Sequence, residues 1–268
     1  MSSIRRKSSD VLSVNTIDRW QENEMKNFFY GDILGVKPTS KCICSDNEIS
    51  ESSFIKHARA TTRLDESCRV CVQMPWKTGY PTKLPNNYLR AKDQLLKRER
   101  QLKRNGKLDE YNKEVEKLIE RGVVKKLSLE ESNNGECGAA WYLNHRIVER
   151  PEKTTTKLRM VFDSACPYQG ICLNDAFYKG PSYTNSLFRC LLRWRKDYIA
   201  VSGDIEKMFN QVVMTEDDQR YHRFLWRNGD ETQPIYVHQW LRLLFGDKPS
   251  PDLAAYALLF LADKNKSS

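Results

Sequence analysis

The order of apolar and polar positions separates a polar start from a longer region with regular periodicity. Residues 1–50 are polar and irregular, apart from one apolar island at 28–36. We expect residues 1–65 to form a linker or a poorly ordered N-terminal segment. The weak alternation of 68–76 predicts a strand that ends at Pro75, because proline interrupts the hydrogen bonding of a strand.

Between Tyr88 and Lys126 the apolar spacing is that of two helices. Leucines three to four positions apart predict a first helix, the turn dipeptide Asn105-Gly106 follows it, and a second amphipathic stretch comes next. Thirteen Lys and Arg stand against seven Asp and Glu here. The simplest interpretation is the solvated face of a helical hairpin, and a nucleic-acid contact is the alternative. We expect 66–130 to form a strand and this basic hairpin.

Strand and helix patterns then mix without a regular βαβ rhythm. Strands are predicted at 141–148, 157–162, 198–202 and 233–240, and helices at 187–194 and 250–262. The strand at 198–202 is expected to be buried and to point at Asp204. This mixture predicts an α+β fold, with 131–262 as the main domain and 263–268 as a polar tail.

Charge adds a preference for an anionic partner. The formal net charge is +9, and lysine and arginine release counterions when they bind phosphate backbones. No apolar run approaches the roughly 20 residues that cross a bilayer, and the first residues lack the apolar core of a secretory signal. We therefore expect an intracellular protein, cytoplasmic or particle-associated, that is not secreted and has no membrane partner.

Some of the eight cysteines invite a zinc interpretation. The residues that would form such a site are Cys42, Cys44, His57, Cys68 and Cys71. Structural zinc sites usually repeat a CxxC or HxxxH spacing, whereas this chain has a single CxxC. Reduced thiols are therefore favoured over a zinc site.

Asp204 is the candidate with the most chemical content. It follows the predicted strand 198–202, where a carboxylate would project from a sheet edge, and Phe209 comes five residues later. A carboxylate in that position suits Mg²⁺, which prefers hard oxygen ligands and bridges them to substrate phosphates. Taken alone, an aspartate after a strand is more often the N-cap of a helix.

Several further segments, in a fixed order, change that weighting. They read TTKLRMVFDSA, LNDAFYKGP, LLRWR, GDIEKMFNQV and HRFLWR, and a glycine-containing turn, LFGDKPSP, opens the last helix. From about Cys68 to Ala262 the chain resembles reverse transcriptases of the BEL/Pao retrotransposon class. The resemblance implies the fingers and the first part of the palm of a right-hand polymerase. It also implies RNA-directed DNA synthesis by two-metal nucleotidyl transfer, with Mg²⁺, a template–primer and deoxynucleotide triphosphates.

The resemblance also implies roles for individual residues. Asp204 matches the first catalytic aspartate, a ligand of both metals, and the Ile205 carbonyl would add a metal contact. Phe209 matches the aromatic gate that excludes a ribose 2′-hydroxyl. Arg159, with Lys153 as a second contact, would hold the incoming triphosphate. Phe245 and Gly246 match the turn that packs against the nucleotide and its template base.

One expected motif is not in the 268 residues. The family's second carboxylate pair lies on a Tyr-x-Asp-Asp hairpin, and this sequence contains no such motif. Asp217-Asp218 sits in a polar pattern typical of a helix start, so we do not assign it to metal binding. We therefore expect this polypeptide to be inactive alone. A non-catalytic remnant that binds nucleic acid is the alternative.

A protease is a remote alternative. Asp163-Ser164-Ala165 is similar to the Asp-Ser/Thr-Gly loop of aspartic proteases, but alanine replaces the glycine. Such proteases need two carboxylates that share a proton. We expect Asp163 to order its loop rather than to bind metal. His145, His222 and His238 have no paired nucleophile and are interpreted as structural.

Overall fold

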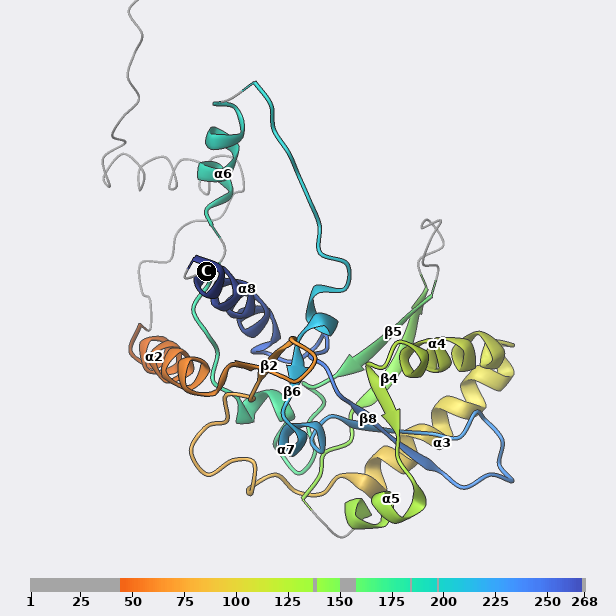
Figure 1. Cartoon of the computed structure of the whole chain (residues 1–268). Helices are drawn as coiled ribbons and strands as arrows, with labels where there is room; N and C mark the ends of the chain where they lie inside the picture. The colour runs from red at the N-terminus through yellow and green to blue at the C-terminus, as the bar shows by residue number, and fades with distance from the viewer. Residues whose placement is uncertain (1–43, 137–138, 150–157, 184, 197, 267–268) are drawn as a thin grey trace, which may run out of the picture. The chain divides into compact units, whose positions relative to one another are not determined.

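The computed structural model describes residues 44–136, 139–149, 158–183, 185–196 and 198–266, which form a mixture of helices and small sheets (Figure 1). The helices are α2 (Cys44–Thr61), α3 (Tyr88–Arg104), α4 (Leu108–Glu120), α5 (Leu129–Glu136), α6 (Leu187–Trp194), α7 (Glu216–Gln219) and α8 (Ser250–Lys266), with the 3-10 turns η2 (Leu173–Ala176) and η3 (Met208–Gln211). None of these helices combines the length and the apolar run that a bilayer crossing requires.

The strands form three small sheets. They are β1 (Arg63–Leu64), β2 (Val70–Val72), β3 (Val124–Lys126), β4 (Asn144–Glu149), β5 (Leu158–Asp163), β6 (Val213–Met214), β7 (Arg223–Trp226) and β8 (Tyr236–Trp240). The first sheet has the order β1-β2-β6, with β2 and β6 parallel. The second has the antiparallel order β3-β8-β7, and β4 and β5 form an antiparallel ribbon. The chain is thus a mixed α and β protein, which agrees with the coarse prediction of an α+β class.

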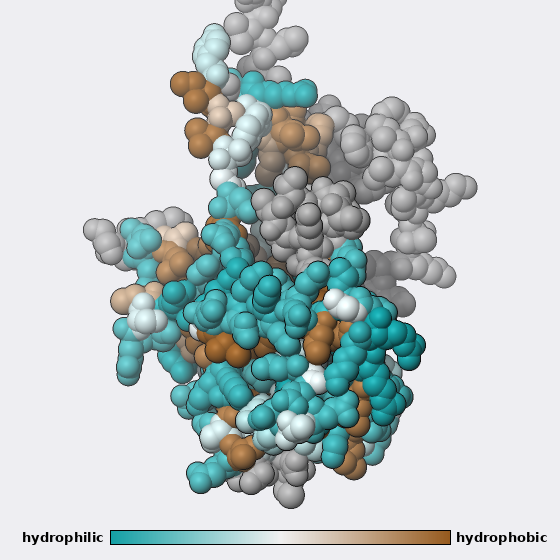
Figure 2. All heavy atoms as spheres, turned by 90° about the vertical axis from the view of Figure 1, so that its right-hand side faces the viewer, coloured by the Kyte–Doolittle hydropathy of each residue, from teal (hydrophilic) through white to brown (hydrophobic). Residues whose placement is uncertain are grey.

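The predicted helical hairpin is present as α3 and α4. Asn105 caps α3, and Gly106 follows with a φ of +64°, a left-handed conformation that glycine adopts without strain. Glu99 of α3 is buried and receives two hydrogen bonds from Arg227, at 3.0 Å from Nε and 2.9 Å from Nη2. This bidentate pair joins the hairpin to the end of β7. The outer face of the hairpin is mainly hydrophilic (Figure 2).

Aromatic rings fill the core between the hairpin and the sheets. Tyr111, Phe224 and Trp226 are completely buried. His145 packs among them, donates from Nε2 to the Leu225 carbonyl at 3.0 Å and accepts the Tyr111 hydroxyl on Nδ1. Burial lowers the pKa of His145 to about 3 and that of His238 to about 4. Both rings are therefore neutral packing groups, as the sequence interpretation expected.

Most predicted elements are present with small boundary shifts. The predicted strands 141–148, 157–162 and 233–240 become β4, β5 and β8, and α6 has the bounds that the sequence predicts. α8 begins at Ser250 and extends past the predicted end. Within 1–65, the described part is the helix α2 and the strand β1, and α2 buries Phe54.

The predicted buried strand at 198–202 is wrong. Residues 199–205 have no regular secondary structure, and the side chains of Tyr198, Ile199 and Val201 are 109%, 83% and 85% exposed. A strand is stabilised by hydrogen bonds and side-chain contacts from a neighbouring strand. None of the strands in the described part of the chain pairs with this segment.

Candidate functional site

The turn between β8 and α8 lies directly against the end of β5. Gly246 has a φ of +115°, which side-chain-bearing residues rarely adopt. A Cβ at this position would lie 2.7 Å from the Phe162 carbonyl oxygen, closer than van der Waals contact permits. The close approach of two backbones therefore requires glycine at 246.

Asn174 fixes both sides of this turn. Its amide Nδ2 donates to the Gly246 carbonyl at 2.9 Å, and its Oδ1 accepts the Lys248 backbone N–H at 2.7 Å. Asn174 belongs to η2, and its backbone N–H donates to the Ser164 carbonyl at 3.1 Å. One side chain thus links the LNDAFYKGP segment to the LFGDKPSP turn.

Buried polar groups hold the same turn from the protein interior. Ser164 Oγ donates to Asp247 Oδ1 at 2.5 Å, and both residues are almost fully buried. His222 Nε2 lies 3.2 Å from Asp247 Oδ2, but its N–H is not aligned with that oxygen, so the contact is electrostatic. Burial alone would lower the pKa of His222, but the Asp247 carboxylate and the Asp218 carbonyl outweigh it and raise that pKa above its ordinary value.

Asp218 extends the network in the other direction. Its carbonyl accepts His222 Nδ1 at 2.8 Å, and its carboxylate accepts the Met74 N–H at 2.7 Å and the Trp76 indole N–H at 2.6 Å. Asp217 and Asp218 lie in α7, which starts after Thr215. The sequence interpretation of this pair as a helix start is confirmed, and Asp218 proves to be a buried structural acceptor that sequence reasoning did not single out.

Two aromatic candidates meet at the surface of this anchored turn. Phe209 of η3 and Phe245 contact each other edge to face, with ring centroids 4.5 Å apart and an interplanar angle of 76°. The next residue, Asn210, donates from Nδ2 to the Leu243 carbonyl at 3.0 Å. Phe245 remains 60% exposed, so its ring is available to a ligand. The fold thus brings Phe209 into contact with the turn that carries Phe245 and Gly246, although 36 positions separate Phe209 from Phe245 in the sequence.

Lysines surround the same turn. Lys77 Nζ donates to the Asp175 carbonyl at 2.7 Å, and Lys248 is tied through its backbone to Asn174. Burial, followed by repulsion from Lys77 and Lys179, lowers the pKa of Lys248, while Asp175 raises it. Like charges held close together favour an anion between them. No local sequence signal marked this three-lysine cluster (Lys77, Lys179, Lys248), because its members come from separate segments.

The candidate metal and triphosphate residues are not part of this assembly. Asp204 is exposed, and no hydrogen bond or ion pair among the described residues involves it. Arg159 is exposed on β5, opposite Val148, and Lys153 lies outside the described residues. The described residues contain no group of three or more His, Cys, Asp or Glu side chains that could hold a metal ion. Asp204 and the Ile205 carbonyl alone therefore do not fit a complete Mg²⁺ site.

The residues of the zinc and protease alternatives have other local contacts. His57 contacts the Gln73 carbonyl at 3.2 Å, Cys71 is buried and Cys68 is exposed; Cys42 lies outside the described residues. Asp163 Oδ1 accepts the Ala165 N–H at 3.0 Å, which is the loop-ordering role expected of it. The hydroxyl of Ser164 is committed to Asp247, so this loop does not present a free Asp-Ser pair.

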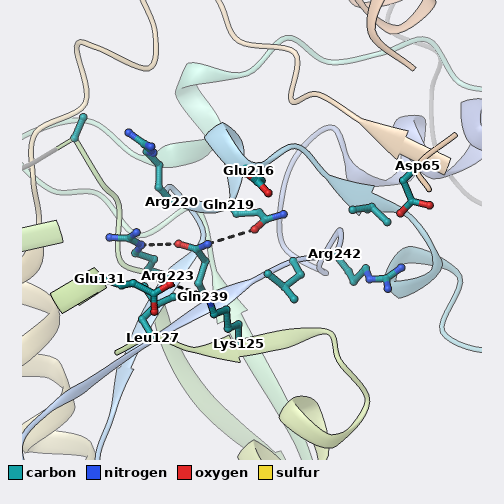
Figure 3. A pocket seen from close by; sticks show the side chains of 13 residues that line it. Asp65, Lys125, Leu127, Glu131, Glu216, Gln219, Arg220, Arg223, Gln239 and Arg242 are labelled. Atoms are coloured by element: carbon teal, nitrogen blue, oxygen red, sulfur yellow. Dashed lines mark hydrogen bonds and ion pairs between the residues drawn. The ribbon is translucent and has the colours of Figure 1, made fainter. Parts of the chain in front are cut away.

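Hollows in the described surface lie elsewhere. A groove of about 630 Å³ is lined by residues of β3, α7, β7 and β8, and none of the aromatic or metal candidates lines it (Figure 3). A concave surface is the default place for a ligand. The separate motif segments converge instead on the turn 245–248.

Comparison with known proteins adds no assignment. No protein-family model matches the chain, and no curated protein matches it either.

Proposed function

We propose that this chain is the fingers and the first part of the palm of a reverse transcriptase of the BEL/Pao retrotransposon class. One observation carries the proposal. The turn 245–248 is contacted by Phe209, Asn174 and Ser164, which belong to three of the segments on which the resemblance rests. Convergence of the motifs on one exposed turn is expected if they form a shared binding site. Motifs with separate packing roles in the core would not need to meet there.

In this proposal, the aromatic pair forms the wall against which a nucleotide lies. The Phe245 ring is held by a turn that Asn174 and Asp247 fix, and Phe209 packs on its edge. A ring held in one orientation can exclude a substituent by bulk alone, which is what discrimination against a 2′-hydroxyl requires. Rigid support of this kind is expected where a site must hold a substrate within fractions of an ångström.

The charge around the turn is consistent with a polyanionic substrate. Lys248 belongs to the turn that carries Phe245, and Lys77, Lys179 and the acid Asp175 act electrostatically on it. Phosphate oxygens would satisfy these ammonium groups, and a template–primer and a deoxynucleotide triphosphate both supply them. Arg159 and Lys153 remain the proposed triphosphate contacts.

The proposed parent reaction uses Mg²⁺, for which Asp204 and the Ile205 carbonyl would be ligands. The described residues do not complete a metal site, so we assign no reaction step to this polypeptide by itself. What the described residues can supply is binding and orientation of the nucleotide. A second candidate function is favoured by the same observation: a chain with a formed binding surface and an exposed Asp204 could hold nucleic acid without reacting.

A chimera tests the proposal. The chain would be fused to the remaining palm and thumb of a BEL/Pao reverse transcriptase, and incorporation of deoxynucleotides and ribonucleotides on an RNA template would be measured. We expect polymerisation that Asp204→Ala abolishes, and Phe209→Val should raise ribonucleotide use by about tenfold or more. The matched control is Phe260→Val on α8, which should leave the sugar preference unchanged.

Two results would decide against the proposal. A folded chimera without activity, together with salt-sensitive RNA binding by the chain, would favour the non-catalytic function. Unchanged sugar preference in an active Phe209→Val chimera would show that Phe209 is not the gate.

A further inference from the structure

The groove in Figure 3 has basic groups toward both ends and amides between them. Arg220 and Arg223 lie toward one end, Arg242 toward the other, and Gln219 and Gln239 lie between. A second hollow of about 950 Å³ adjoins it and shares Asp65, Val213, Glu216 and Gln219, and its lining adds the acids Glu66 and Asp217 and the base Arg63. The basic part of this surface is therefore the first groove, between Arg223 and Arg242.

Two of the groove's three carboxylates already accept hydrogen bonds from the protein itself. Glu131 accepts Lys125 Nζ at 2.7 Å and the Ser128 N–H at 2.8 Å. Asp65 Oδ1 accepts the backbone N–H groups of Ser67 and Arg69 at 2.9 and 2.8 Å. Lys125 thus offsets the charge of Glu131, whereas Asp65, whose pKa is lowered chiefly by the Arg69 N–H, keeps its charge and interacts electrostatically with Arg242. Glu216 is the third acid of this groove.

The arginines, by contrast, retain unused donors. Arg223 donates from Nε to Gln239 Oε1 at 2.9 Å, and Gln239 donates from Nε2 to Gln219 Oε1 at 3.3 Å. No carboxylate of the described residues pairs with Arg242, whose Nη1 is buried without a hydrogen-bond partner. Burial, followed by repulsion from Arg69, lowers the pKa of Arg242. A buried guanidinium N–H without a partner is costly, and an anion in the groove would relieve that cost after a small side-chain rotation.

We propose that this groove is a second binding site, which takes phosphate groups of a nucleic-acid strand at Arg223 and Arg242. Guanidinium forks match phosphate oxygens in pairs, and the amides of Gln219 and Gln239 between them suit sugar or base edges. A polymer whose charges repeat along its length fits a groove with basic groups at separate points better than a single anion does. The choice of nucleic acid rests on the proposed function; the phosphate site itself does not.

Fluorescence anisotropy with a short labelled oligo(rU) tests the site on the full chain. We expect the double variant Arg223→Gln/Arg242→Gln to bind about tenfold or more weakly, because it loses charge-assisted hydrogen bonds. The matched control, Arg121→Gln/Arg195→Gln, removes the same charge at exposed positions outside the groove and should change affinity about twofold or less. Uridine monophosphate and inorganic phosphate would be added as competitors.

The outcomes separate the sources of the phosphate. If unlabelled oligonucleotide competes far better than uridine monophosphate, the ligand is a nucleic-acid strand. If the two compete equally, the groove is a nucleotide site with the same phosphate chemistry. Equal loss of affinity in the double variant and its control, or equal competition by polyglutamate, would overturn the site.

A second measurement covers the case in which the double variant folds poorly. Photocrosslinking of the unmodified chain with a thiouridine-containing oligonucleotide should label peptides that contain 219–223 or 239–242. Labels confined to other peptides would overturn the site. If the chimera polymerises but the chain shows no binding in the groove, this inference is wrong and the proposed function stands. If the groove binds the oligonucleotide but the chimera is inactive, the proposed function is wrong and this inference stands.

Discussion

The two halves of one motif lie in contrasting surroundings. The second half of GDIEKMFNQV, around Phe209, is held by the Phe245 ring and by the hydrogen bond from Asn210 to Leu243. The first half contains Asp204, which follows the exposed residues Tyr198 to Val201 and α6, none of whose side chains is buried. The difference is one of contacts: Ile205, the apolar residue of the first half, is 43% exposed, whereas Met208 and Phe209 of the second half pack against the core.

The comparison shows what each kind of element needs. The turn 243–250 is stabilised by groups that the described chain itself provides: a glycine, an asparagine clamp and the buried Ser164–Asp247–His222 contacts. A strand at 198–202 would instead need a neighbouring strand to satisfy its backbone and cover its side chains. Exposed apolar groups in succession are characteristic of a surface that is covered in an assembly.

The largest expected effect is the loss of the glycine that lets the turn lie on β5. Gly246→Ala should lower the free energy of unfolding by about 3 kcal/mol, from left-handed strain and from the clash with the Phe162 carbonyl. Gly106→Ala is the matched control, because it has a positive φ but no atom within 4 Å of the added Cβ. It should cost about 1 kcal/mol. Urea unfolding measures both, and equal losses would mean that the close approach is not important.

A smaller, pH-dependent effect should come from His222. Its pKa is raised in the folded chain, so its contribution to stability is complete below the unfolded pKa of about 6.5 and is lost as pH rises through the folded value. Asp247→Asn removes the carboxylate that favours the proton. Its stability deficit should therefore be greatest at mildly acidic pH and shrink as pH rises.

The deficit has to be read as a difference between variant and parent. His145 and His238 have lowered pKa values, so they destabilise both proteins as pH falls below about 6.5. That background cancels in the difference. A deficit that is constant across this pH range would mean that His222 is not charged in the folded protein.

The sequence predicts elements whose determinants are local. The spacing of leucines and the Asn105-Gly106 turn were sufficient for α3 and α4, and Ser250-Pro251 marked the start of α8. Phe209, Phe245 and Gly246 were identified through the resemblance, and they prove to be neighbours. The three-lysine cluster and the Asp218 acceptor were missed, because they depend on tertiary contacts between segments far apart in the chain.

The strand at 198–202 failed for a related reason. Apolar content predicts that a segment can be buried, but burial also requires a partner surface, which the segment's own residues do not encode. Val72 and Val201 illustrate this. Both lie in short apolar stretches, yet Val72 is completely buried and paired with β6 while Val201 is 85% exposed.

The smallest predicted effect is that of Val201→Ala, and its difference from Val72→Ala tests the comparison directly. Val72→Ala should lower the free energy of unfolding by about 2 kcal/mol, because it removes buried methyl groups and leaves a cavity. Val201→Ala deletes the same atoms from an exposed site and should change stability by about 0.5 kcal/mol or less. Urea unfolding of the two variants under one set of conditions is sufficient, since the chemistry of the substitution is identical. A loss at Val201 as large as that at Val72 would mean that 198–202 is packed in solution, and the contrast between the exposed segment before Asp204 and the paired strand β2 would then disappear.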